Sequence, residues 1–269
     1  MPRAHPIAPR ATPAFLLLAV ALAGCSGAEP PVAAPATTGF TIATYNVNFG
    51  LAGDPQTLDA IGTIGADIVA LQEVTEPWER AIRDRYQRDY PYLAFHHYQP
   101  YPAGGVALLS RYPIRERALI DGIKSWFPAW RVDVDVPGRR LQLLVVHLRP
   151  VVSDDGSMVK GLFQIGGIHD QEIRHFAARL EPQRPTIVLG DFNESKDARA
   201  IAFLAERGFA DALPRFAPNA TTWRWPTKLG EMTAMLDHIL VGPDLEIEQA
   251  EGLELGRSDH WPVRVRIGR

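Results

Sequence analysis

Short apolar runs recur along the chain from about residue 40 onward, and polar turns separate them. Runs rich in Val, Ile, Leu, Tyr and Phe are typical of β-strands. Eight such runs predict strands at residues 40–47, 68–72, 106–110, 132–136, 141–147, 186–189, 238–241 and 263–267. Several are apolar at every position, which predicts strands that are covered on both faces.

Helical patterns lie between these runs. Asp54 and Pro55 are typical of a helix start, and Gly65 of its end, so the pattern predicts a helix over 54–64. Similar patterns predict helices over 75–86, 170–180 and 196–207. Strands and helices mixed at this density indicate an α/β or α+β fold. No repeat of fixed period and no second linker interrupt residues 40–269, so we expect one domain there.

The first residues follow a different pattern. Arg3 and Arg10 precede an apolar run at 14–22, which is short for a membrane span and typical of a secretory signal. The run ends in the sequence LAGC, which resembles the lipobox of bacterial lipoproteins, and Ser26 fits outer-membrane sorting. We therefore expect a signal peptide at 1–24, a lipid-modified Cys25, and a Pro-, Ala- and Thr-rich tether at 25–39. This predicts a secreted protein anchored at the periplasmic face of, or exposed on, a bacterial outer membrane; a plain signal peptide is the alternative.

Cysteine content and charge restrict the chemistry. Cys25 is the only cysteine, so internal disulfides, thiol catalysis and a cysteine-based zinc site are excluded within one subunit. The formal net charge is −3, which argues mildly against strong nonspecific affinity for duplex DNA, although a local basic patch remains compatible with it. Nothing in the sequence indicates an obligate protein partner.

Polar residues stand at or just beyond the ends of the apolar strands. They are Asn46, Glu73, His147, Asp191, Asn193 and the pair Asp259 and His260. Functional side chains collect at such edges, because the strand fixes the backbone and the loop frees the side chain. Each residue taken alone has an ordinary structural explanation, such as a turn-forming Asn.

Seven motifs occur in a fixed order: ATYNV at 43–47, DIVALQEV at 67–74, GVALLSR at 105–111, VVHL at 145–148, GDFN at 190–193, LDHI at 236–239 and SDH at 258–260. Together they resemble the endonuclease/exonuclease/phosphatase superfamily of DNase I-like phosphohydrolases. The resemblance spans 40–269. It implies a four-layer α/β/β/α sandwich of two mixed β-sheets flanked by helices, and a metal-dependent hydrolase of phosphate esters.

The resemblance also implies a metal site. Glu73 corresponds to the principal ligand, with Asn46 beside it and Asp259 close by or bound through water. Carboxylate and amide oxygens suit Mg²⁺, which we expect, or Mn²⁺ or Ca²⁺. The absence of a cysteine ligand set and of a His-x-x-x-His pattern disfavours zinc.

Catalytic roles follow from the same resemblance. Asp191 orients or deprotonates the attacking water, and Asn193 donates to a phosphoryl oxygen. His260 is the catalytic imidazole, as a base or as an electrophile, and Asp237 accepts its other N–H. His147 is a second phosphate contact.

A basic residue that neutralises developing charge is assigned more loosely. We expect Arg131, because it opens the strand that pairs in order with the strand of His147, while Arg111 and Arg149 are alternatives. Many family members carry Arg shortly before the Asp of the LDHI segment, whereas this chain has Met235 and Leu236 there. One phosphate contact of the family is therefore in doubt.

The substrate stays open between nucleic acid, a lipid headgroup and a small phosphate ester, with a nuclease-like phosphodiesterase as the first hypothesis. A nuclease favours a basic cleft, and a phospholipase or sphingolipid phosphodiesterase an exposed apolar hairpin. Trp223 and Trp225 either line the cleft or pack in the core, and Gly-rich residues 151–170 predict a substrate loop. A hypothesis of another class is a binding lipoprotein without turnover.

Overall fold

The computed structural model describes residues 39–122, 127–150, 158–228 and 230–268. The predicted signal peptide, Cys25 and nearly all of the predicted tether lie outside the described residues. No helix in the described part of the chain has both the length and the apolar character needed to cross a membrane.

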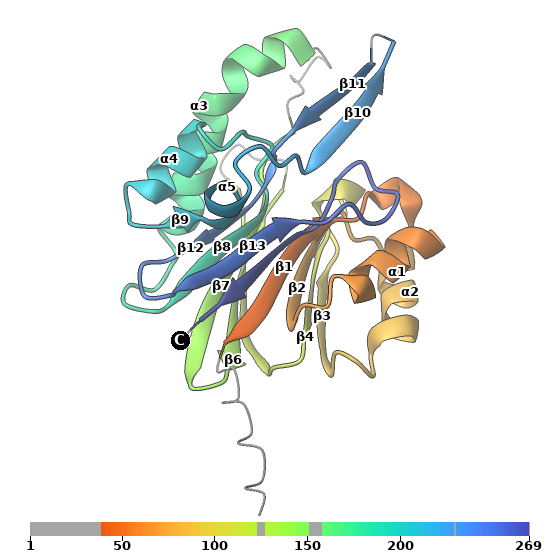
Figure 1. Cartoon of the computed structure of the whole chain (residues 1–269), viewed down its shortest axis with the longest axis vertical. Coiled ribbons are helices and arrows are strands. Elements are labelled where there is room, and N and C mark those ends of the chain that lie inside the picture. Colours follow the sequence, from red (N-terminus) through yellow and green to blue (C-terminus); the bar gives the residue numbers. More distant parts are fainter. Residues whose placement is uncertain (1–38, 123–126, 151–157, 229, 269) are drawn as a thin grey trace, which may run out of the picture. The chain divides into compact units, whose positions relative to one another are not determined.

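Two six-stranded mixed β-sheets form the centre of the fold (Figure 1). The first sheet has the order β13 (Ile247–Gly252), β14 (Val263–Ile267), β1 (Phe40–Asn46), β2 (Ile68–Gln72), β4 (Val106–Ser110), β3 (Tyr92–His96). The second has the order β5 (Ile114–Ile120), β6 (Ala129–Val136), β7 (Arg139–His147), β8 (Thr186–Asp191), β12 (Asp237–Val241), β9 (Ala210–Asp211). All eight predicted strands are present.

Helices cover the outer face of each sheet. Helices α1 (Pro55–Thr63) and α2 (Glu76–Tyr86) pack on the first sheet, and α3 (Met158–Ala177) and α4 (Arg199–Ala205) pack on the second (Figure 1). A short helix α5 (Ala212–Phe216) contributes to the core between the sheets. This confirms the four-layer α/β/β/α sandwich.

Apolar residues on both faces of the central strands build this layering. In β1, Ile42 faces the second sheet, while Ala43 and Tyr45 face the helices of the first layer. In β7, Leu143 and Val145 belong to the core between the sheets, while the alternate residues Leu144 and Val146 face α3 and α4. Strands buried on both faces are the expected outcome of runs that lack polar alternation.

Helix α3 differs from the sequence-based expectation. The predicted substrate loop at 151–170 is wrong from Met158 onward, where the helix begins, and 151–157 lies outside the described residues. Buried positions at 165, 169, 172, 173 and 176 recur with helical spacing, so packing on the second sheet overrides the low helix propensity of the adjacent Gly166 and Gly167. Two of these buried side chains, His169 and Glu172, are polar.

Burial raises the pKa of Glu172 to about 7, against the opposing effect of the nearby His169. The folded state therefore holds this proton more tightly than the unfolded state, whose carboxyl titrates near 4.5. The stability that protonated Glu172 contributes is fully present below pH 4.5 and is lost as the pH rises to about 7. The difference between the folded and unfolded pKa values of Glu172 corresponds to about 3 kcal/mol in the free energy of unfolding.

Glu172→Gln should remove this dependence. The free energy of unfolding of the native protein, measured by chemical denaturation relative to the variant, should fall between about pH 4.5 and 7 and then level off. Other titrating groups cancel in the difference. A difference that stays flat across this window would show that Glu172 does not retain its proton.

Gly190 lies directly before Asp191 in β8 and has φ +145°. A Cβ atom there would stand 1.9 Å from the carbonyl oxygen of Val146 in β7. Because backbone atoms cannot move aside without breaking the β7–β8 pairing, only glycine fits. The residue lets these two strands approach closely at the end where the polar residues stand.

Gly190→Ala should therefore lower the free energy of unfolding by about 3 kcal/mol or more. Gly138 is a matched control, since it also has positive φ (+79°) but no atom within 4 Å of the added Cβ. Gly138→Ala should cost only about 1 kcal/mol. Equal losses for the two variants in chemical denaturation would contradict the steric argument.

Candidate active site

Strand register brings three of the predicted site residues into one row. In the second sheet His147 on β7 pairs with Asp191 on β8, and Asp191 pairs with Asp237 on β12. In the first sheet Asn46 at the end of β1 pairs with Gln72, which precedes Glu73. The row and this pair meet at the same edge of the sandwich, as predicted from the positions of these residues at strand ends.

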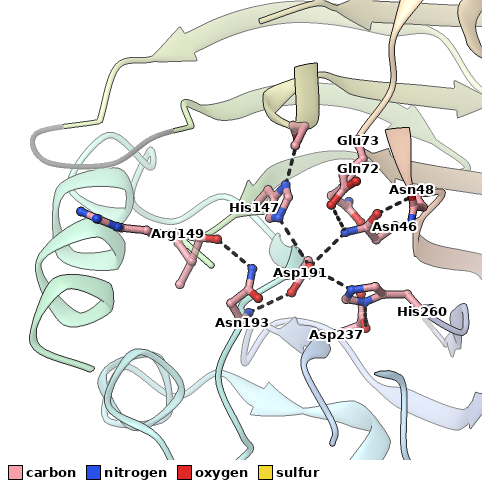
Figure 2. Close-up of polar contacts among 12 residues, drawn as sticks. Asn46, Asn48, Gln72, Glu73, His147, Arg149, Asp191, Asn193, Asp237 and His260 are labelled. Carbon is pink, nitrogen blue, oxygen red and sulfur yellow. Dashed lines mark hydrogen bonds and ion pairs between the residues drawn. The ribbon is translucent and has the colours of Figure 1, made fainter. Parts of the chain in front are cut away.

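Asp191 is the centre of the cluster (Figure 2). Its Oδ2 lies 3.1 Å from Asn46 Nδ2, 3.5 Å from His147 Nε2 and 3.5 Å from His260 Nε2. Its Oδ1 accepts a hydrogen bond of 2.9 Å from the backbone N–H of Asn193. A single buried carboxylate thus contacts groups from both sheets and from the segment before β14.

His260 is held by Asp237. Its Nδ1 donates to Asp237 Oδ2 at 2.8 Å, so Nε2 is directed at Asp191. Burial lowers the pKa of His260, but the charges of Asp237 and Asp191 and the Asp237 hydrogen bond outweigh it and raise the pKa to about 10. The imidazole is therefore stabilised as a cation between carboxylates.

His147 is oriented by a backbone carbonyl. Its Nδ1 lies 3.1 Å from the oxygen of Ala103, which can only accept, so Nδ1 carries the proton and Nε2 faces Asp191. The ring of Phe127 lies over it, with ring centroids 4.5 Å apart. Both histidines thus present Nε2 to the same oxygen of Asp191.

The Asn46 side chain donates hydrogen bonds to two carboxylates. Its Nδ2 donates to Glu73 Oε1 at 3.0 Å and to Asp191 Oδ2 at 3.1 Å, and its Oδ1 accepts from the N–H of Asn48 at 3.0 Å. These contacts favour a role in orienting Glu73 and Asp191 over the predicted role as a metal ligand. Glu73 Oε2 also accepts from Phe49 N–H at 3.0 Å.

Asn48 is a site residue that the sequence-based prediction missed. Its Nδ2 donates to Asp259 Oδ1 at 2.9 Å, which links the end of β1 to the third predicted metal residue. The available signal was its spacing: Asn46 and Asn48 are two apart after a strand, as Asp191 and Asn193 are. Site roles were predicted for Asp191 and Asn193, whereas of the other pair only Asn46 was given one.

Unusual backbone conformations concentrate here. Within the described residues, four non-glycine residues have positive φ, and three of them are site residues: Asn48 (60°), Glu73 (64°) and Asn193 (48°). Asn tolerates this region, but for Glu it costs about 1 kcal/mol or more. The surrounding contacts therefore hold the Glu73 side chain in an orientation that an ordinary strand end would not give it.

The donor set fits a hard divalent cation. Asp191, Asp237 and His260 bring ligand-type atoms within 4.8 Å of one another, but Asp237 and His260 already bind each other. Glu73 and Asp259 are half-buried, and no Arg or Lys of the described segments pairs with them or with Asp191. Asn46 links Glu73 to Asp191, and Asn48 binds Asp259, so two carboxylates without a basic partner stand next to the buried cluster. Their oxygen ligands and negative charge suit Mg²⁺, Mn²⁺ or Ca²⁺.

Asn193 and Arg131 lie in different environments. Asn193 Nδ2 donates to the carbonyl oxygen of Leu148 at 3.0 Å, so this amide stands beside the cluster and joins the segments after β7 and β8. Arg131 is not brought to the cluster: its guanidinium donates to the carbonyl oxygen of Arg179 at 2.9 Å and lies 3.4 Å from Glu181. The prediction for Arg131 is therefore wrong, because the neighbours Trp130 and Val132 occupy the core face and direct it outward.

The two alternatives to Arg131 also lie apart from Asp191. Arg111 pairs with Asp67 at 2.9 Å, at the opposite end of β2 from Glu73. Arg149 is the second residue after β7, but Figure 2 shows its side chain directed away from Asp191. Charge neutralisation in this cluster therefore depends on the histidines and a cation.

A hairpin of β10 (Trp223–Thr227) and β11 (Gly230–Ala234) stands beside the cluster and projects beyond both sheets (Figure 1). Trp223 pairs with His260 through an isolated bridge, and the N–H of Arg224 donates to Asp259 O at 2.9 Å. The Trp223 and Trp225 rings stack with 10° between their planes. Trp225 is 51% exposed and Met232 is 53% exposed, so this hairpin presents apolar surface next to the site.

Comparison with known proteins agrees with this geometry. A model of the Endonuclease/Exonuclease/phosphatase family matches residues 43–260. A search of curated protein sequences gave no match.

Solved structures share the fold. An endonuclease/exonuclease/phosphatase from Beutenbergia cavernae is 17% identical, with a TM-score of 0.67 over 86% of this chain and 72% of that one. The 3'-5' exonuclease NExo from Neisseria meningitidis is 19% identical, with a TM-score of 0.61 over 85% and 100%. Truncated Caenorhabditis elegans TDP2 is 18% identical, with a TM-score of 0.61 over 86% and 98%. The chain belongs to the endonuclease/exonuclease/phosphatase family and is a hydrolase that acts on phosphoester bonds.

Proposed function

We propose that the chain is a divalent-metal-dependent phosphodiesterase in which activated water attacks phosphorus in line with the leaving oxygen. The convergence of His147, His260, Asn46 and Asn193 on Asp191 carries this proposal. Members of the family generally depend on a divalent metal. A binding protein without turnover would have no need for a buried carboxylate at the centre of two oriented imidazoles.

The roles of the residues follow from their contacts. Asp191 is the general base that orients water and accepts its proton, because its Oδ2 is the one acceptor on which three side chains converge. His260, with Nδ1 engaged by Asp237, presents Nε2 to a phosphoryl oxygen. His147 Nε2 and the Asn193 amide stand on the other side of Asp191 and would contact the remaining oxygens.

A cation would be held by Glu73 and Asp259, and we propose Mg²⁺. Bound there, it would supply Lewis-acid stabilisation of the charge that develops on phosphoryl oxygens. Asn46 and Asn48 would orient the two carboxylates through the amide hydrogen bonds at 3.0 and 2.9 Å.

Nucleic acid is the proposed substrate class. The 3'-5' exonuclease NExo shares the fold over its whole length, and the stacked Trp223 and Trp225 beside the site suit a planar base. The test compares hydrolysis of single-stranded DNA, duplex DNA, RNA, sphingomyelin vesicles and p-nitrophenyl phosphate by the full chain with Mg²⁺. Nucleic acid should be cleaved fastest, and preference for a monoester would overturn the proposal.

The exposed hairpin favours a second candidate, hydrolysis of a lipid headgroup diester. Trp225 and Met232 would then contact the interface of a membrane. Replacing both by Ser should abolish sedimentation with vesicles and lower vesicle hydrolysis, while cleavage of a soluble phosphodiester should be unchanged. Loss of nucleic-acid cleavage alone would instead assign the hairpin to base stacking.

We also propose, from the sequence motif alone, that Cys25 is lipid-modified and anchors the protein to a bacterial membrane, with the outer membrane as first choice. Mass spectrometry of the mature N-terminal peptide should detect a diacylglyceryl cysteine, and Cys25→Ser should release the protein to the soluble fraction. An unmodified N-terminus at another residue would contradict lipid anchoring.

A further inference from the structure

His169 connects helix α3 to the two segments that carry the cluster. It is fully buried, and neither the predicted mechanism nor the family motifs include it. Its Nε2 lies 2.6 Å from the carbonyl oxygen of Arg149, and its Nδ1 lies 3.0 Å from Glu194 Oε1. A carbonyl oxygen can only accept, so Nε2–H is the donor. The contact between Nδ1 and Glu194 Oε1 is within ion-pair distance but does not have hydrogen-bond geometry.

The two partners of His169 are close to the cluster in sequence. Arg149 follows His147 by two residues, and Glu194 directly follows Asn193. The segments touch first where the Leu148 carbonyl accepts from Asn193 Nδ2 at 3.0 Å. His169 joins them a second time, farther from Asp191, so two connections fix their separation and relative rotation.

Glu194 is itself held from two other directions. Its Oε2 accepts from the N–H of Ala200 at 2.9 Å, at the start of α4, and its carbonyl oxygen accepts from His238 Nε2 at 2.9 Å. The carboxylate is buried, and among the described residues His169 is the only ion-pair partner within 4 Å of it. Removing His169 would leave the buried Glu194 carboxylate with the Ala200 N–H but no ion-pair partner, which favours rearrangement of the segment.

We propose that His169 is a positioning residue that clasps the segment after β7 to the segment after β8 and so holds His147 and Asn193 in register around Asp191. The inference rests on the proposed function of that cluster. A displacement of about 1 Å at a reacting group lowers the rate by about a hundredfold. A residue that positions catalytic side chains from a distance therefore affects kcat. The polar contacts of His169 are to the Arg149 carbonyl and to Glu194, outside the cluster around Asp191, so substrate binding should be little changed.

His169→Ala in the full chain should lower kcat for phosphodiester cleavage by about 10- to 100-fold, with KM changed by less than about threefold. Two conservative variants each keep one half of the clasp. The Gln amide of His169→Gln can still donate to the Arg149 carbonyl, and the Asn amide of His169→Asn can still donate to Glu194. Both should recover part of kcat, and both keep the test valid if the Ala variant folds poorly.

His175 provides the matched control. It lies on the same helix and donates from Nε2 to a carbonyl oxygen, that of Asp121 at 2.8 Å, away from the cluster. His175→Ala should leave kcat and KM unchanged. A fall in kcat shared by both variants would reduce His169 to a general stabiliser of α3 and overturn the proposal.

A readout without substrate separates this inference from the proposed function. The Asn193 N–H, which donates to Asp191 Oδ1, should exchange with solvent about tenfold faster in His169→Ala than in the native protein or in His175→Ala. Faster exchange in a protein that cleaves no phosphodiester would support the clasp and refute the proposed function. Unchanged exchange would refute the clasp, whatever the kinetics.

Discussion

Asp191→Asn is expected to lower kcat for phosphodiester cleavage by about a thousandfold or more, because the variant loses the base on which both imidazoles converge. The amide also presents a donor where Asn46 Nδ2 and the histidines approach a carboxylate oxygen. KM should change little, since Asp191 acts on water. Steady-state kinetics with a soluble phosphodiester at saturating Mg²⁺ measures this.

Asp197→Asn is the control for the Asp191 variant. Asp197 is an exposed carboxylate six residues further along the chain, in the loop after β8, so the substitution makes the same chemical change outside the cluster. It should keep full activity. Circular dichroism should show that Asp191→Asn is folded, because the change removes one of two buried carboxylate charges that lie close together. Activity within tenfold of the native protein would exclude Asp191 as the general base.

Glu73→Gln should remove most of the metal dependence. The Gln oxygen can still accept one hydrogen bond, but the charge that attracts a cation is gone. We expect kcat/KM to fall by about a hundredfold or more at fixed Mg²⁺, with partial recovery at higher metal concentration. Chelator should abolish the activity of the native protein.

Thermal unfolding gives a second readout for the metal site. A cation that binds only the folded state adds about 2.7 kcal/mol at one hundred times its dissociation constant, so Mg²⁺ should raise the Tm of the native protein by several degrees. The shift should disappear in Glu73→Gln and persist in Glu206→Gln, which changes an exposed carboxylate far along the chain. An equal shift in both variants would place the ion elsewhere.

Much of the site could be predicted because strand ends are visible in the sequence. His147, Asp191 and Asp237 end or begin apolar runs, and the pairing of β7, β8 and β12 then places them in one row. The family motifs supplied Glu73, Asp259 and His260 in the same way. The apolar runs predicted eight of the strands, the helical patterns between them predicted the helices, and the family resemblance supplied their arrangement in two sheets.

Some of the remaining errors concern side-chain direction, which sequence order does not determine, and others concern missed secondary structure. Arg131 lies on a correctly predicted strand but points to its outer face. Asn46 and Asn48 differ in role because the backbone turns through positive φ at Asn48, which no apolar pattern reveals. The β10–β11 hairpin was missed because its exposed strands lack an apolar run, and the start of α3 was missed because two glycines favoured a loop.

The claim that Asp191 and His260 act as one hydrolytic unit is tested most directly by the kcat of the double variant Asp191→Asn/His260→Ala. If the two residues serve the same step, the double variant should be no slower than the slower single variant, within about threefold. Losses that multiply, or a double variant that keeps native activity, would show that the two side chains do not form one active centre.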